Sequence, residues 1–406
     1  MRANPTVRAI TAATALSLAI SSVAAAQSVD EEQLVFAESM PSTLSAVVTN
    51  ALDPGNYNTL VTGTAKSYHS ERLGGRDKPP VEPKKNANKQ PPPGGWIERG
   101  PVEGTDTVTQ AALSLAGEES PNLMLVSGGD WTANVGIARL NPSTTILDLN
   151  APTPCLDESG RADASAECIA GAEAAPGNYR AIEFAVEEGA YLAGVIAARE
   201  SRGMPLGIIS GALDCLECDR YVTGFINGAR SVEPEIEIEL AYLADDEVAG
   251  FGDGASAKTY AEAFIEVYQP GVLLPIGRGA TMGMVEAACE ADVKVIGAGI
   301  DISAERPDFR QSCVMTSIVP DVARAVEEGM YYFSTGGGPP VITYDLSGGG
   351  VTMTEEWFVS PTKRVDTNEF FDAAKLAIQT DQVEPCPDGC GVFAPEPDAE
   401  DVAVAG

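Results

Sequence analysis

The sequence is poor in the residues that most catalytic and metal sites use. Its 406 residues include a single histidine, His69, and only nine lysines. One imidazole, in a polar segment over residues 66–71, offers little for acid–base catalysis. The CxxC pair of Cys215 and Cys218 has no second pair at zinc-finger spacing, and no GxSxG nucleophile elbow occurs. The residues therefore give no support for an enzyme or a metal centre, and no cofactor is expected.

Positive charge is also scarce. The chain has 26 Lys and Arg against 59 Asp and Glu, which gives a formal net charge of −33. Such a chain repels nucleic acid phosphates and anionic lipid surfaces. After the N-terminus, no stretch approaches the roughly 20 apolar residues of a membrane span. Nucleic acid is therefore not expected as a partner, and the membrane is expected only through another protein.

The N-terminus has the features of a secretory signal peptide. Arg2 and Arg8 give a positive start, residues 9–20 are apolar, and residues 24–26 form a small-residue cleavage site of the A-x-A kind. Cleavage after Ala26 would remove residues 1–26. No cysteine stands directly after the apolar run, so no lipid anchor is expected. The pattern predicts a periplasmic or extracellular protein.

Eight cysteines follow this export signal, so disulfides are the first hypothesis. A redox role for the CxxC pair is the alternative, because that spacing lowers thiol pKa. Proximity suggests these pairs, the last by elimination: Cys155 with Cys168, Cys215 with Cys218, Cys386 with Cys390, and Cys289 with Cys313.

Strand and helix patterns alternate along the chain, which predicts parallel sheets covered by helices on both faces. Too many units occur for one sheet of usual size, so we expect an α/β protein of two doubly wound, Rossmann-like lobes. Strands are predicted at residues 44–49, 123–127, 144–149, 181–186, 206–210, 236–242, 272–276, 294–297 and 314–318. Helices are predicted at residues 107–115, 132–139, 188–199, 220–231, 256–268, 282–290, 322–333 and 368–377.

Three residues at predicted strand ends are candidates for ligand contact, because ligands of doubly wound sheets bind beyond the carboxyl ends of the strands. Asp148 and Asp301 could accept hydrogen bonds from ligand N–H or O–H groups, although each could instead be a helix N-cap or a loop carboxylate. Gly277 suits close approach of backbone to ligand, or a tight turn.

A short run beginning at Glu187 resembles a known family. Residues 187–194 read EEGAYLAG and follow Phe184, which is similar to the F…EGAYLAG signature of the basic membrane protein family. Further similarities follow in order, and a degraded D-K-S-F-N run precedes them; they lie in residues 224–234, 251–258, 277–288, 296–301, 315–317 and 53–58. The resemblance covers roughly residues 44 to 360. It implies a type I periplasmic-binding-protein fold whose two lobes are joined by a hinge.

The resemblance also implies site residues. Tyr57 and Phe251 fall at family positions that sandwich a purine base, and Asn58 offers a donor and an acceptor to its edge. Each has a plainer alternative: both rings could be packing aromatics, and Asn58 could be a turn residue. The family's aspartate for ribose hydroxyls falls on Gly299 or, with a one-residue slip, on Asp301, and the place of its lysine holds Val319 and Pro320. A free purine base is therefore an alternative ligand to a nucleoside.

The family comprises substrate-binding components of ABC transporters, so the expected partners are a small-molecule ligand (a purine nucleoside or base) and a transporter permease. A chemosensory receptor of the same fold and a nucleoside-processing enzyme are the alternatives. The first lobe is expected at residues 27–203 with about 314–338, and the second at 204–313 with about 339–380. Residues 74–104, rich in Pro and Lys, are predicted to be a flexible insertion, and residues 381–406 an acidic tail.

Overall fold

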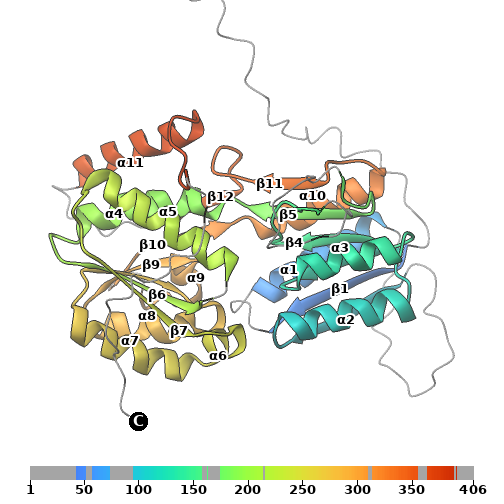
Figure 1. Cartoon of the computed structure of the whole chain (residues 1–406), viewed down its shortest axis with the longest axis horizontal. Helices are drawn as coiled ribbons and strands as arrows, with labels where there is room; N and C mark the ends of the chain where they lie inside the picture. Colours follow the sequence, from blue (N-terminus) through green and yellow to red (C-terminus); the bar gives the residue numbers. More distant parts are fainter. Residues whose placement is uncertain are drawn as a thin grey trace, which may run out of the picture. The chain divides into compact units, whose positions relative to one another are not determined.

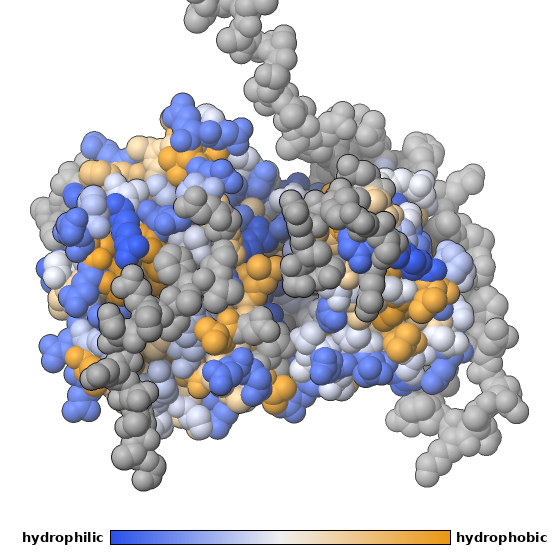
Figure 2. Space-filling model, viewed as in Figure 1, coloured by the Kyte–Doolittle hydropathy of each residue, from blue (hydrophilic) through white to orange (hydrophobic). Residues whose placement is uncertain are grey.

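The computed structural model describes residues 43–51, 57–73, 95–157, 162, 174–213, 215–309, 313–354, 364–387 and 390. Within them the chain forms two six-stranded sheets, each with helices on both faces (Figure 1). This confirms the predicted class of two doubly wound α/β lobes. None of the described helices is both long and apolar enough to cross a membrane. Polar side chains cover much of the face shown in Figure 2, with smaller apolar groups among them.

The first lobe is built on a sheet of six parallel strands in the order β11-β5-β4-β3-β1-β2. The strands are β1 (Ser45–Asn50), β2 (Trp96–Val102), β3 (Leu123–Ser127), β4 (Thr145–Leu149), β5 (Tyr179–Phe184) and β11 (Val341–Tyr344). Its helices are α1 (Tyr57–Arg72), α2 (Thr105–Glu118), α3 (Trp131–Leu140) and α10 (Val322–Thr335). Apolar side chains of α1 and α10 share one core cluster, and those of α2 and α3 share another.

The second lobe has the strand order β12-β10-β9-β8-β6-β7, parallel except for the antiparallel edge strand β12. The strands are β6 (Leu206–Ala212), β7 (Ile238–Ala244), β8 (Val272–Ile276), β9 (Lys294–Ala298), β10 (Val314–Pro320) and β12 (Val351–Met353). Its helices are α4 (Val186–Glu200), α5 (Leu216–Val232), α6 (Glu247–Gly252), α7 (Gly254–Tyr268), α8 (Thr281–Glu290), α9 (Ile302–Glu305) and α11 (Arg364–Gln379).

The chain crosses between the sheets at three places, which differ from the predicted divisions. Ala185 links β5 to α4, Asp321 links β10 to α10, and residues 345–350 link β11 to β12. The divisions expected after residues 203, 313 and 338 fall one element away from these crossings. The alternation of strand and helix patterns predicts that a helix follows a strand, but it does not predict which of the two sheets that helix covers.

Two elements of the first lobe correct the sequence interpretation. Helix α1 was not predicted, and it includes the polar segment over residues 66–71. Its buried residues Val61, Ala65 and His69 recur every four positions, as on one face of a helix. Strand β2 lies inside the supposed flexible insertion; it pairs only with β1, at the sheet edge, and its middle residues are exposed. An edge strand tolerates proline and lacks the apolar alternation of a covered strand. The rest of that insertion, residues 74–94, lies outside the described residues.

Three disulfides are present among the described residues: Cys215–Cys218, Cys289–Cys313 and Cys386–Cys390. Each matches a predicted pair. The remaining predicted pair is Cys155 with Cys168. Cys168 lies outside the described residues, so this pair stays a prediction.

Helices α4 and α5 pack backbone against backbone through glycines. A Cβ on Gly194 of α4 would overlap the carbonyl of Phe225 in α5, and one on Gly228 of α5 would overlap the carbonyl of Tyr191 in α4. No side chain fits between the helices at these points. The glycine that ends the EGAYLAG run is therefore required by packing rather than by backbone conformation.

We predict that Gly194→Ala lowers the free energy of unfolding by about 1–3 kcal/mol or more, because the added methyl must push two backbones apart. Gly136→Ala is the matched control. Gly136 lies inside α3 with nothing within 4 Å of its Cβ position, so the change should stabilise the protein by about 0.5–1 kcal/mol. Urea unfolding of both variants checks this, and equal effects would contradict the packing argument.

Candidate functional site

A cavity of about 490 Å³ lies at the carboxyl ends of strands from both sheets. First-lobe residues around it follow β3, β4 and β5; second-lobe residues begin α5 or follow β8, β9 and β10. This is where ligands of doubly wound sheets bind. Of the six predicted site residues, Tyr57, Asp148 and Gly277 line the cavity, whereas Asn58, Phe251 and Asp301 do not.

Asp148, at the end of β4, is the buried carboxylate of the first-lobe wall. It is 1% exposed, and its Oδ2 accepts hydrogen bonds from Asn134 Nδ2 at 3.0 Å and from the Tyr179 hydroxyl at 2.8 Å. Its Oδ1 accepts none from the described part of the chain. Burial raises the pKa of Asp148 from 3.8 to about 7, against the lowering effect of both hydrogen bonds. This wall therefore carries an acceptor that gains a proton near neutral pH.

The turn after β3 adds an aromatic ring that the sequence analysis missed. Asp130 caps α3 by accepting a hydrogen bond from Thr132 N at 2.9 Å, and Trp131, the first residue of α3, lines the cavity. A tryptophan directly after the strand-end run SGGD was the available signal. Tyr57, at the start of α1, supplies a second aromatic ring to the same wall.

The side chain of Asn58 makes a hydrogen bond within the first lobe and does not line the cavity. Its Nδ2 donates to the carbonyl of Asn50 at 2.6 Å, which joins the first turn of α1 to the end of β1. The contact resembles the turn role that was the alternative for this residue. It fixes the neighbouring Tyr57 relative to the sheet.

Phe251 corrects an expectation. The resemblance implied that it stacks on a purine base, but it lies in α6 and is fully buried. Its ring packs on Gly211 of β6, where any side chain would collide with it. The guanidinium of Arg278 lies 4.9 Å from the ring centroid. The glycines of β6 and α6 let the helix approach the sheet closely. Phe251 therefore packs against Arg278, a residue of the cavity wall, without lining the cavity itself.

Asp301 also lies outside the cavity, as the N-cap of α9, where its carboxylate accepts from Ala304 N at 3.1 Å. Gly299, two residues earlier, lines the cavity with a φ of 82°. Gly277 lines it too, and its N–H donates to Thr281 Oγ1 at 3.1 Å, which closes the turn after β8.

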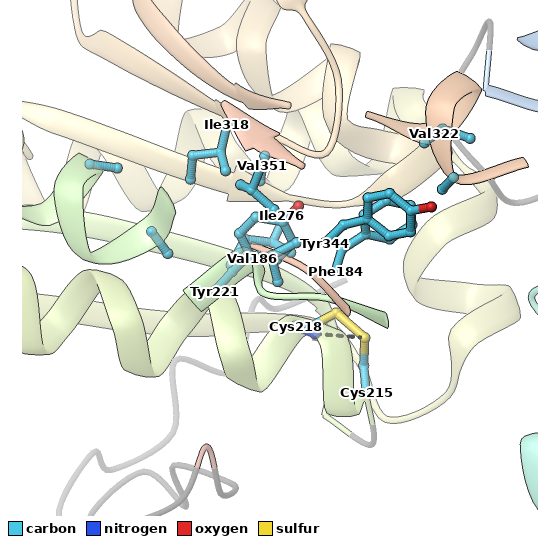
Figure 3. Close-up of a cluster of buried hydrophobic side chains, with 14 of the residues drawn as sticks. Phe184, Val186, Cys215, Cys218, Tyr221, Ile276, Ile318, Val322, Tyr344 and Val351 are labelled. Carbon is cyan, nitrogen blue, oxygen red and sulfur yellow. Dashed lines mark hydrogen bonds between the residues drawn. A yellow bond between two sulfur atoms is a disulfide. The ribbon is translucent and has the colours of Figure 1, made fainter. Parts of the chain in front are cut away.

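The first turn and a half of α5, with its N-cap Cys215, supplies the longest continuous run of residues in the second-lobe wall. It includes the Cys215–Cys218 disulfide, drawn in Figure 3 below Phe184. Arg220 donates to both carboxylate oxygens of Glu187 at 2.7 and 2.8 Å and to Glu183 at 2.8 Å. Arg278 donates to Glu217 at 3.3 Å.

Charge in the cavity is therefore one-sided. Both cations on its wall are held by glutamates, while four carboxylates contribute to the lining: Asp130, Asp148, Glu217 and Asp219. Such a site suits a neutral or cationic ligand that donates hydrogen bonds, and it disfavours phosphates and carboxylates.

The two sheets, the three crossings and a cavity between the strand ends define a two-lobed solute-binding protein. More specifically, the chain belongs to the PnrA-like family of ABC transporter substrate-binding proteins, which matches residues 163–377.

Similar proteins agree with this assignment. The nucleoside-binding protein BmpA of an ABC transporter from Lactococcus lactis is 30% identical over 198 residues, 43% of this chain and 52% of the relative. The chain thus spans about half the length of the curated relatives it matches. A solute-binding protein from Aeropyrum pernix K1 shares the fold with a TM-score of 0.61 at 15% identity, covering 85% of this chain and 93% of that one. A transcriptional activator of the comK gene from Bacillus halodurans shares it with a TM-score of 0.57 at 19% identity, over 84% and 99%.

We predict a pH dependence of stability from Asp148. A carboxyl whose pKa rises on folding stabilises the protein below its unfolded pKa, and that contribution is lost as pH rises through the folded value. Between pH 5 and pH 8, wild type should lose about 2–3 kcal/mol more than Asp148→Asn, because each tenfold change in proton affinity corresponds to about 1.4 kcal/mol. An Asn at this position can still accept from Asn134 and Tyr179. Urea unfolding at the two pH values measures the difference.

The control is Asp301→Asn, which removes a carboxylate outside the cavity and should keep the wild-type loss of stability. Identical pH profiles for Asp148→Asn and wild type would show that Asp148 does not carry the effect.

Proposed function

We propose that the protein is the substrate-binding component of an ABC transporter and that it binds a purine nucleoside or nucleobase in the cavity between its lobes. The composition of the cavity wall carries the proposal: aromatic rings of Tyr57 and Trp131 line the same cavity as the acceptor carboxylate of Asp148. A purine is flat and aromatic, and its edge carries N–H groups that a carboxylate can accept. The similarity to BmpA, a nucleoside-binding protein by name, supports the same ligand class.

The size and charge of the cavity restrict the class of ligand. A cavity of about 490 Å³ falls within the range of about 300–1,000 Å³ for small-molecule sites. The carboxylates on its wall disfavour the binding of nucleotides, because they repel phosphate groups. Both arginines of the wall, Arg220 and Arg278, are already paired with glutamates. We therefore expect neutral purines to bind and their monophosphates not to bind.

The proposed mechanism is closure of the lobes about the three crossing segments. Hydrogen bonds join these segments: Ala185 N donates to Tyr344 O at 2.9 Å, and Asp321 N donates to Gly350 O at 2.8 Å. Glu188 Oε2 accepts from Leu346 N at 2.7 Å. The segments therefore bend together, and a ligand that contacts both lobes shifts the population toward the closed form. We propose that the closed form docks a membrane permease, in the periplasm or outside the cell, without chemical change to the ligand.

We predict that titration calorimetry detects binding of adenine, guanine or hypoxanthine, or of their nucleosides. Trp131→Ala and Tyr57→Ala should each weaken binding about 5- to 150-fold, because a stacking face contributes on the order of 1–3 kcal/mol. Tyr57→Phe is the matched control: it keeps the ring and should lose much less. Trp131 should also report binding through its fluorescence.

Two outcomes would contradict the proposal. Wild type that gives no heat with any purine, alongside clear binding of a sugar or an amino acid, would overturn the ligand class. Binding of adenosine monophosphate as tight as that of adenosine would contradict the charge argument.

A further inference from the structure

Tyr221 presents a polar group that the protein itself does not satisfy. It lies in α5, lines the cavity and is only 2% exposed. Its hydroxyl has no hydrogen-bond partner among the described residues. A buried hydroxyl without a partner costs free energy, because it has lost its hydrogen bonds to water. A ligand atom that pairs with it would recover that free energy.

A glycine that lines the cavity lies next to this hydroxyl. Gly299 lines the cavity, and a Cβ placed on it would lie 3.6 Å from the Tyr221 oxygen, with no other contact within 4 Å among atoms beyond its chain neighbours. Because Gly299 has no side chain, the space at its Cβ position, 3.6 Å from the hydroxyl, is left open. Tyr221 belongs to the same buried cluster as Val186 and Ile276, drawn in Figure 3, and all three residues line the cavity.

The hydroxyl is available as a donor. Burial raises the pKa of Tyr221 well above 10, so the phenol keeps its proton. The arginines of the same wall already donate to glutamates, Arg220 to Glu183 and Glu187 and Arg278 to Glu217. Tyr221 therefore brings a neutral O–H to a wall whose cations are engaged.

We propose that Tyr221 is a specificity-determining residue whose hydroxyl donates a hydrogen bond, next to Gly299, to an acceptor atom of the bound ligand: a ring nitrogen or a hydroxyl or carbonyl oxygen. The inference rests on the proposed function and deepens it. Asp148 on the first lobe accepts from the ligand, and Tyr221 on the second lobe donates to it. A ligand with a donor edge and an acceptor edge contacts both lobes at once, and this favours closure.

The test compares Tyr221→Phe with wild type by titration calorimetry, using adenosine, guanosine, inosine and their free bases. The substitution removes one oxygen and keeps the ring. Binding of the purine that wild type prefers should weaken about 5- to 150-fold, because the ligand acceptor is left buried and unpaired. Tyr260→Phe, on α7 and away from the cavity, is the control and should bind as wild type does.

Stability gives an independent readout. In the ligand-free protein, Tyr221→Phe should keep or raise the melting temperature, since it deletes a buried group without a partner. Tyr179→Phe should lower it, because its hydroxyl donates to Asp148 at 2.8 Å. A fall in melting temperature for Tyr221→Phe as large as that for Tyr179→Phe would overturn the inference.

Analogues of the ligand then identify the acceptor. 3-Deazaadenosine, 7-deazaadenosine and 2′-deoxyadenosine each lack one acceptor atom of adenosine. For the analogue that lacks the atom paired with Tyr221, wild type and Tyr221→Phe should bind equally, because the two deletions remove the same bond.

The outcomes separate the two proposals. If wild type binds no purine, the proposed function fails and takes this inference with it. If wild type binds a purine and Tyr221→Phe binds it with the same affinity, the inference alone is overturned.

Discussion

The contact between α4 and α5 fixes the second-lobe wall of the cavity. The two helices meet through glycines, so their separation is set by backbone atoms and leaves no freedom for side chains to adjust. Helix α4 begins one residue after the first crossing at Ala185, and the first residues of α5 line the cavity. The position of Tyr221 and of the Cys215–Cys218 disulfide therefore follows from how closely α5 can approach the helix that leaves the first sheet.

The same contact explains the arrangement of charge. Because α5 lies against α4 close to the crossing, Arg220 reaches Glu187 on α4 and Glu183 on β5, on either side of Ala185. One guanidinium thus joins both lobes and is withdrawn from ligand binding. The other arginine of the cavity wall, Arg278, pairs with Glu217 within the second lobe. With both arginines paired to glutamates, the wall is rich in acceptors, which is the basis for expecting a neutral or cationic ligand that donates hydrogen bonds.

Much of the fold was predictable, because covered parallel strands and amphipathic helices leave periodic patterns. Strands β3 and β8 begin and end where the sequence predicted, and the doubly wound class followed from the alternation. Edge strand β2 was missed because its exposed residues carry no alternation. The lobe divisions were misplaced because the sheet that a helix covers is decided by long-range packing.

The site divides in a similar way. Asp148 and Gly277 were predicted because ligands of doubly wound sheets bind beyond the carboxyl ends of the strands, and both residues line the cavity. Phe251 was expected at the ligand from its family position alone, which does not show that the glycines of β6 and α6 let the helix pack this ring into the core. Trp131 was missed although its place directly after a strand end was a usable signal. Tyr221 was missed because burial next to an open space is a property of three-dimensional packing and leaves no local pattern in the sequence.

The three crossings also determine the order in which the protein can be assembled. Strand β11, the edge of the first sheet, is encoded after all but the last strand of the second sheet, and β12 follows it. Neither lobe is therefore complete until residues near position 350 have been synthesised, so the lobes cannot fold one after the other like separate domains. Pairings between strands so distant in sequence form slowly, and a chain cut short before β11 would leave the open edge of β5 exposed to other strands.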